Sequence, residues 1–167
     1  MKQHFSACVD GGLAFVDSIA AKAVIFIMGV MVAVVSAQVA LRYGFNNSID
    51  WADEISRLCF VWLIFLAIPL GIRRGAHIGI ELLTVRLPPR FRDSLYRVMV
   101  VLAAGLAGIV CVEGFRLTLD QWDEPMPTIS APIALFMLPI GIGMAHSVVH
   151  LLRLAVRGEP QKGLVIE

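Results

Sequence analysis

The sequence predicts an all-α integral membrane protein: a single membrane domain over residues 1–167, with four transmembrane helices and a short amphipathic helix at the membrane interface. Of the 167 residues, 58% are hydrophobic and 16% are charged, and the net charge is +1. A soluble domain of this length has too little interior to bury so much apolar surface. The small net charge also argues against nucleic acid as a partner, because phosphate binding needs a clustered basic face.

The first two spans are expected at about residues 19–41 and 50–72. No Asp, Glu, Lys or Arg lies between Lys22 and Arg42, a stretch about as long as a helix needs to cross the hydrocarbon core. The second apolar run is shorter, but a helix that begins at Asp50 reaches roughly 34 Å. Asp50 is a favourable N-cap, and the acidic residues that follow it suit the positive end of a helix.

The last two spans are expected at about residues 93–119 and 131–153. The third helix follows Pro88 and is longer than a bilayer is thick, so it must tilt or protrude. The fourth has no Asp, Glu, Lys or Arg up to Leu152, but Pro139 interrupts it. Neighbouring helices can satisfy the backbone groups that this proline frees.

Residues 77–87, between the second and third spans, have the pattern of an amphipathic interfacial helix. Ile78, Leu82 and Val85 recur at helical spacing, and polar residues stand between them. Such a helix would lie in the inner membrane surface. The alternative is a basic connector that happens to contain leucines.

The distribution of Lys and Arg predicts the orientation, because cytoplasmic loops retain these residues. Most of the 14 lie before the first span, between the second and third, or after the fourth. We therefore expect both termini in the cytoplasm. The opposite face carries three arginines, Arg42, Arg57 and Arg116, and seven acids: Asp50, Asp53, Glu54, Glu113, Asp120, Asp123 and Glu124.

Few titratable residues fall within the spans, so we expect no catalytic site, metal site or cofactor. Glu113 is the deepest acid, and Arg116 at i+3 can pair with it at the interface. A haem-binding membrane anchor of a redox complex is the main alternative, with His77, His146 and His150 as candidate ligands. However, His146 and His150 share one helix face, so another ligand would have to lie opposite them. The three cysteines follow no paired or metal-binding spacing.

A small transporter that assembles from copies of itself is a further alternative. Such a transporter is expected to place a carboxylate inside the bundle, and the first span offers only Ser36 and Gln38 as polar residues. Small residues in the later spans instead allow close helix packing, within the chain or toward a partner. They are Ala104, Gly105, Gly108, Gly141 and Ala145.

The segment that enters the second span carries the strongest local pattern. Arg57 lies at i+4 from Asp53 and at i+3 from Glu54, so either carboxylate can compensate its charge at the membrane boundary. Trp51 and Trp62 lie on nearly the same helix face. The pattern predicts either an aromatic interfacial anchor with a surface salt bridge or a partner-binding site.

Several motifs along the chain occur together in one known family. They are, in order, Trp51, Glu54, Arg57, Trp62, Gly71-Ile72-Arg73-Arg74-Gly75-Ala76-His77-Ile78, Leu87-Pro88, Gly114 and Pro139-Ile140-Gly141. Through them the chain resembles, over about residues 14–154, the small membrane subunit of tripartite ATP-independent periplasmic (TRAP) transporters. Ala67 is a departure, because members often have glycine in this part of the second span.

The resemblance implies a non-catalytic subunit, not an enzyme, in a bacterial inner membrane. This subunit would contact membrane lipids and brace a large multi-span permease. That permease would move an organic acid anion by an elevator-like motion driven by a sodium gradient, and a periplasmic solute-binding protein would deliver the anion. Part of the acidic outer face would then meet the binding protein or the permease. The residues expected to have structural or partner-contact roles are Trp51, Asp53, Glu54, Arg57, Trp62, Arg73, Arg74, His77, Pro88, Glu113, Arg116 and Pro139.

Overall fold

The computed structural model describes residues 2–47, 49–73 and 89–157, and their side chains from residue 11 and, after the second gap, from residue 94. These residues form four long helices and one short 3-10 helix. The predicted interfacial helix at 77–87 lies outside the described residues. The elements are α1 (Lys2–Gly44), α2 (Asp50–Arg73), α4 (Pro89–Asp120), η1 (Ile133–Phe136) and α5 (Leu138–Arg157).

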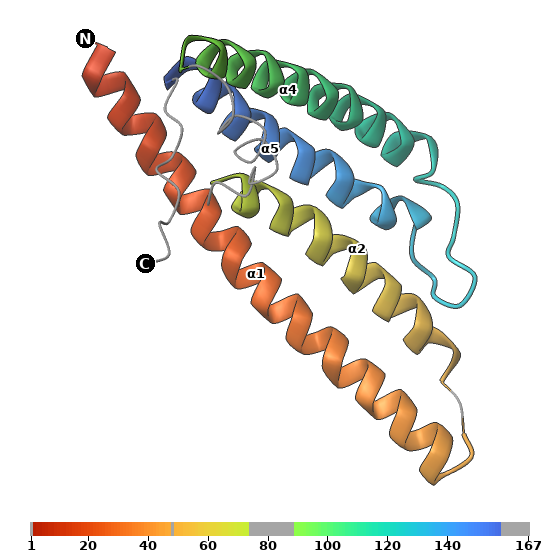
Figure 1. Ribbon diagram of the computed structural model, residues 1–167. Helices are drawn as coiled ribbons and strands as arrows, with labels where there is room; N and C mark the ends of the chain where they lie inside the picture. Colours follow the sequence, from red (N-terminus) through yellow and green to blue (C-terminus); the bar gives the residue numbers. More distant parts are fainter. Residues whose placement is uncertain (1, 48, 74–88, 158–167) are drawn as a thin grey trace, which may run out of the picture.

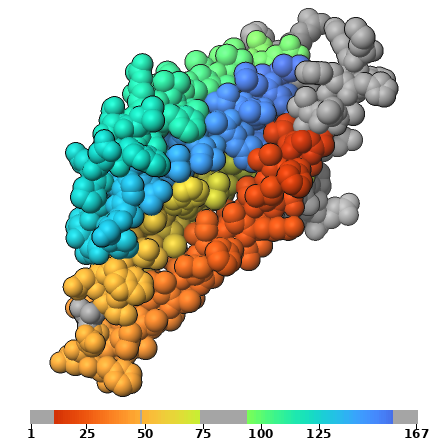
Figure 2. All heavy atoms as spheres, turned by 180° about the vertical axis from the view of Figure 1, so that it is seen from behind, coloured from red at the N-terminus to blue at the C-terminus, as the bar shows by residue number. Residues whose placement is uncertain are grey.

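The four long helices lie side by side in one layer, in the order α1, α2, α5, α4 (Figure 1). The last helix of the chain, α5, therefore lies between α2 and α4 and packs against both. Seen from behind, α1 and α4 form the two edges of this layer (Figure 2). The turn between α1 and α2 projects beyond the loop that joins α4 to η1.

Four helical stretches are long and apolar enough to cross a membrane, as the sequence predicts, and the last of them runs through η1 into α5. These stretches are Gly11–Gly44, Asp50–Arg73, Ser94–Asp120 and Ile133–Val156. Because a single layer leaves two faces uncovered, much of this apolar surface is exposed: Ile25 and Phe26 of α1 are 74% and 72% accessible, and Leu106 and Ile109 of α4 are 65% and 64% accessible. Soluble proteins do not leave such continuous apolar faces open to water, whereas a bilayer covers them.

The chain reverses sharply between α1 and α2. Asn46 adopts a φ of 51°, in the left-handed region that Asn tolerates better than most residues. The backbone amides of Phe45 and Asn47 both donate to the carbonyl of Leu41, which closes the end of the helix. The reversal brings the start of α2 back against α1, where the side-chain amide of Gln38 donates to Asp53 at 2.9 Å.

Pro139 lies in the first turn of a helix, where the fourth span was expected to be interrupted. The chain forms η1 and then, after Met137, begins α5 at Leu138. A proline in the first helical turn removes no intrahelical hydrogen bond, because the amides there have no helical partner. The amides of Ile140 and Gly141 donate to the carbonyl of Met137, so the helix continues after the proline without a gap in its hydrogen bonding.

Glycines set how closely α5 approaches its neighbours. A Cβ atom on Gly143 would lie 2.2 Å from the carbonyl oxygen of Phe65 in α2, closer than any atoms can pack. On the other side, a Cβ on Gly114 of α4 would lie 2.9 Å from the backbone nitrogen of Gly141. Close backbone approach of this kind is a main source of helix association in lipid. Gly105, in contrast, has open space beside its own helix where an added Cβ would stand.

We expect Gly143→Ala to separate α2 from α5 and to lower the free energy of unfolding by about 1–3 kcal/mol, the usual cost of overpacking. The measurement is the thermal unfolding midpoint of the purified protein in mild detergent. Gly105→Ala is the matched control, because it adds the same methyl group to a helix without a clash and should leave the midpoint unchanged or slightly raised. Equal midpoints for the two variants would mean that α5 does not lie against the backbone of Phe65.

Candidate functional site

The polar side chains gather at the two ends of the layer. We define the Asp17 cluster as Asp17, Arg73, His146 and His150, and the Glu54 cluster as Gln38, Asp53, Glu54 and Thr128. Because Glu54 and Arg73 lie near opposite ends of α2, the two clusters are separated by most of the length of that helix. Residues 58–72, between them on α2, contain no Asp, Glu, Lys or Arg.

The Asp17 cluster joins three helices. The carboxylate of Asp17 in α1 is buried, at 2% accessibility, and Arg73 at the end of α2 pairs with its Oδ2 atom at 3.2 Å. The Nε2 atoms of His146 and His150 in α5 both lie 2.9 Å from its Oδ1 atom. The two imidazole nitrogens are 3.2 Å apart. One carboxylate therefore connects α1 to both α2 and α5.

Asp17 is the member of this cluster that the sequence analysis does not single out. It precedes the stretch taken as the first span, and its partners on α5 are 133 residues away in the chain. The i+4 spacing of His146 and His150 indicates that they share a face, and the structure confirms this. The signal that could have found Asp17 is an isolated carboxylate on the apolar extension of the first helix, which needs a partner if it is buried.

The Glu54 cluster joins the start of α2 to the loop of residues 121–132. The backbone amide of Thr128 donates to Oε2 of Glu54 at 3.0 Å, and the Thr128 hydroxyl donates to the same oxygen in a second, short hydrogen bond. Trp62, two turns further along α2, donates from Nε1 to the carbonyl of Leu135 in η1 at 3.1 Å. These bonds hold the connection between α4 and α5 against α2.

The ion pair that the sequence spacing suggests for Arg57 is not formed. In the described part of the chain Arg57 makes no salt bridge with Asp53 or Glu54, because Asp53 accepts from Gln38 and Glu54 accepts from Thr128. Local spacing suggested the pair, but partners from distant segments take both carboxylates. Arg57 instead lines a groove of about 770 Å³ between α2, the loop and the start of α5, together with the apolar side chains of Val61, Phe65, Phe136, Met137 and Ile140.

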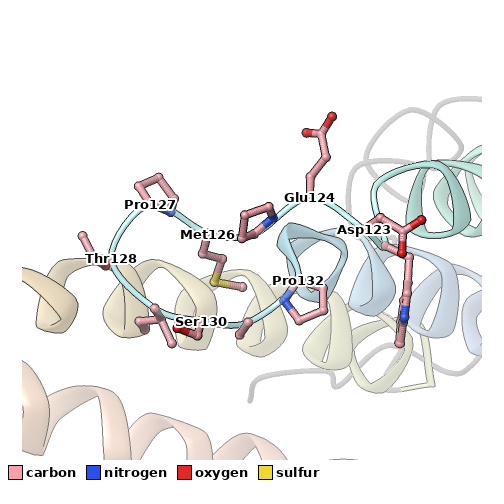
Figure 3. Close-up of a pocket in the computed structure, with 11 residues that line it drawn as sticks. Asp123, Glu124, Met126, Pro127, Thr128, Ser130 and Pro132 are labelled. Atoms are coloured by element: carbon pink, nitrogen blue, oxygen red, sulfur yellow. The ribbon is translucent and has the colours of Figure 1, made fainter.

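The loop of residues 121–132 is itself closed by backbone hydrogen bonds. The amide of Met126 donates to the carbonyl of Ala131 at 2.8 Å, and the amide of Ile133 donates to the carbonyl of Glu124 at 2.8 Å. Met126 is buried on the inner side of the loop, whereas the Glu124 carboxylate points away from it (Figure 3). The loop thus presents an acidic side chain outward from a defined backbone.

The remaining predicted residues are spread over the layer. Glu113 and Arg116 form the expected pair at 3.0 Å on the exposed surface of α4. Trp51 is 49% accessible, while Trp62 is partly buried by its bond to η1. Pro139 is buried in the first turn of α5. Arg74, His77 and Pro88 lie outside the described residues.

The geometry of His146 and His150 does not suit a haem between them. Both rings direct Nε2 toward Asp17 from the same face of α5, whereas two axial ligands approach a haem iron from opposite sides. The two nitrogens could instead ligate one small ion together with the Asp17 carboxylate.

Comparison with known proteins identifies the family. The model of the DctQ component of tripartite ATP-independent periplasmic transporters matches residues 31–160, which cover the last third of α1 and all of α2, α4, η1 and α5. The chain belongs to this family. Asp17 precedes the matched range, whereas the other three members of the Asp17 cluster fall within it.

Individual relatives of this DctQ-family chain are named as TRAP components. It is 37% identical over 118 residues to the C4-dicarboxylate TRAP transporter small permease protein DctQ of Vibrio cholerae, a match that covers 70% of this chain and 47% of the relative. It is 26% identical over 90 residues to the sialic acid TRAP transporter small permease protein SiaQ of the same species, covering 54% and 52%. Against the isethionate TRAP transporter permease protein DctMQ of Oleidesulfovibrio alaskensis, it is 29% identical over 98 residues, or 56% of this chain and 15% of that protein.

The chain therefore spans about half the length of these small permease relatives, and a small part of the longer one.

We expect Glu54→Ala to loosen the loop of residues 121–132. The variant removes the charged acceptor of the Thr128 amide, and a hydrogen bond to a charged group contributes about 1.5–3 kcal/mol, so amide exchange in this loop should become at least about tenfold faster. The measurement is hydrogen–deuterium exchange of peptides that cover the loop. Glu54→Gln, which keeps an acceptor oxygen, should give an intermediate rate.

Glu113→Ala is the control for this experiment, because it removes an exposed carboxylate whose pair is local to α4. If exchange in the loop rises equally in Glu54→Ala and Glu113→Ala, then Glu54 does not hold the loop.

Proposed function

We propose that the chain is the non-catalytic small membrane subunit of a TRAP-type secondary transporter, in which it braces a large elevator-type permease subunit. The observation that carries the proposal is the single layer of helices, in which the charged groups of the described residues lie away from the middle of the spans. Within the described residues, no carboxylate, lysine or arginine lies in the middle of a span, so no chain of charged groups crosses the layer. Such a layer suits a frame rather than a transport pathway.

The exposed faces of the layer support a permanent membrane partner. Along α4, Leu102, Leu106 and Ile109 are largely exposed, and Gly105 and Gly108 have open space where a Cβ would stand. Small residues beside exposed leucines allow a partner helix to come close. The permease protein DctMQ supports a large partner as well, because the region similar to this chain takes up only 15% of that much longer protein.

The relatives also support the class of substrate. Their names refer to C4-dicarboxylates, sialic acid and isethionate, all of which are organic acid anions. We infer that the assembled transporter takes up an organic acid anion, that a sodium gradient drives the uptake, and that a periplasmic solute-binding protein delivers the anion.

The proposed orientation places the Asp17 cluster at the cytoplasmic side of a bacterial inner membrane and the Glu54 cluster at the periplasmic side. The support is the distribution of Lys and Arg, most of which flank the Arg73 end of the layer, together with both termini. The acidic loop of residues 121–132 then faces the compartment of the binding protein, where its charge would orient the encounter.

We expect the tagged chain, purified gently from its native membrane, to bring with it a much larger multi-span protein and to be colourless. Mass spectrometry and a visible absorption spectrum are the measurements. A haem absorption band, or a preparation that contains redox subunits, would contradict the proposal and favour a haem-bearing anchor.

Reversing the charge of the outer loop tests docking of the binding protein. The double variant Asp123→Lys/Glu124→Lys should slow uptake of an organic acid by the reconstituted transporter several-fold at low salt, and the difference should shrink as salt screens the charges. The control is Glu159→Lys/Glu167→Lys, which reverses two acids expected on the cytoplasmic side. An unchanged rate and salt dependence in the loop variant would count against docking at this loop.

A further inference from the structure

We propose that Asp17, His146 and His150 bind a divalent transition-metal ion of the zinc class, and that this ion links α1 to α5. The proposal concerns the Asp17 cluster, which neither the family match nor the proposed function of the chain explains. All three side chains are wholly or largely buried, and each offers one ligand atom to the same point.

The spacing of the ligand atoms is close to that of a tetrahedral site. Oδ1 of Asp17 lies 2.9 Å from Nε2 of His146 and 2.9 Å from Nε2 of His150, and the two nitrogens are 3.2 Å apart. Zinc bonds of about 2.0–2.1 Å place the ligand atoms of a tetrahedral ion about 3.3 Å apart. Binding therefore needs the triangle to expand by no more than about 0.4 Å per edge.

Hydrogen bonds alone leave one of the three contacts in this triangle repulsive. Each Nε2 atom carries at most one hydrogen. If both donate to the Asp17 carboxylate, two N–H groups with like partial charges face each other at 3.2 Å. If one imidazole donates to the other, the acceptor nitrogen turns a lone pair toward the carboxylate oxygen at 2.9 Å. A cation between the three atoms attracts all of them, and this attraction outweighs the repulsion between them.

Arg73 prepares the carboxylate for this role. Its guanidinium pairs with Oδ2 at 3.2 Å and leaves Oδ1 to the ion, which is how outer-shell partners orient a ligating carboxylate. The Arg73 side chain is 54% accessible, so its charge is partly solvated, and this side of the cluster gives the ion a route in from the surface.

The donor set selects the class of ion. Two histidines at i and i+4 on one helix face are an arrangement that helical zinc sites use. Imidazole nitrogens favour zinc and its transition-metal neighbours over Mg²⁺ and Ca²⁺, which take oxygen ligands. Three protein ligands leave the fourth tetrahedral position for a water molecule.

The position of the ion gives it a structural role. In the described residues α1 packs mainly along α2, and α5 lies on the other side of α2. A metal bound by Asp17 and by both histidines would tie the edge helix α1 directly to the central helix α5.

The test uses the full-length chain, purified with the proteins that accompany it, through a tag without histidines and in buffers without chelator. Elemental analysis should find about one equivalent of zinc per chain. Treatment with EDTA should lower the thermal unfolding midpoint, and added Zn²⁺ but not Mg²⁺ should restore it. Replacement of the ion with Co²⁺ should give the visible absorption of a tetrahedral site, a readout that needs no variant.

The matched variants compare two pairs of histidines. His146→Gln/His150→Gln should lose at least about tenfold in bound zinc, while His4→Gln/His77→Gln, which removes the other two histidines of the chain, should keep it. Wild-type protein that holds no stoichiometric zinc and gains no stability from Zn²⁺ would overturn the proposal, as would equal zinc in the two variants. In either case the cluster is a hydrogen-bonded ion pair only.

Discussion

The close approach of α5 to the backbone of α2 at Gly143 is the constraint on which the arrangement of the layer depends. In lipid the apolar side chains of neighbouring helices gain little by leaving their solvent, so contact at short backbone distance has to stabilise the packing. Gly143 allows α5 to lie against Phe65, and Gly114 with Gly141 allows α4 to lie on the other side. The last helix of the chain thereby enters the layer between two earlier ones, and everything at the ends of α5 is positioned by that insertion.

Insertion of α5 brings distant segments together at both ends of α2. At one end the segment that leads into α5 packs against α2, where Glu54 accepts from the amide of Thr128 and Trp62 donates to the carbonyl of Leu135. At the other end His146 and His150 meet the carboxylate of Asp17, which Arg73 also holds. The middle of the layer is joined by packing and its ends by polar bonds. This division follows from the cost of polar groups in hydrocarbon, which is lowest near the headgroups.

The parts of this structure that depend on local sequence were predictable, and the parts that depend on the order of the layer were not. Runs without charge predict the four long helices, and an i+3 spacing predicts the pair of Glu113 with Arg116. The same local reasoning was wrong for Arg57, because Gln38 and Thr128 come from other segments and take the carboxylates beside it. Asp17 could not be connected with His150 without knowing that α5 lies next to α2 rather than at the edge.

A frame that stays fixed while another subunit moves has to resist shear between its own helices. Apolar contacts between smooth helices resist sliding weakly, whereas a glycine seated on a neighbouring backbone and a bond to a buried carboxylate both fix the register. Helix α1 has the least packing of the four: its most apolar 18-residue window has no buried residue, and it meets the layer through α2 alone over most of its length. A cross-link from Asp17 to α5 would therefore fix the helix that has the least packing of its own. The need to fix α1 explains why a buried carboxylate, its arginine partner and two histidines come together in the Asp17 cluster.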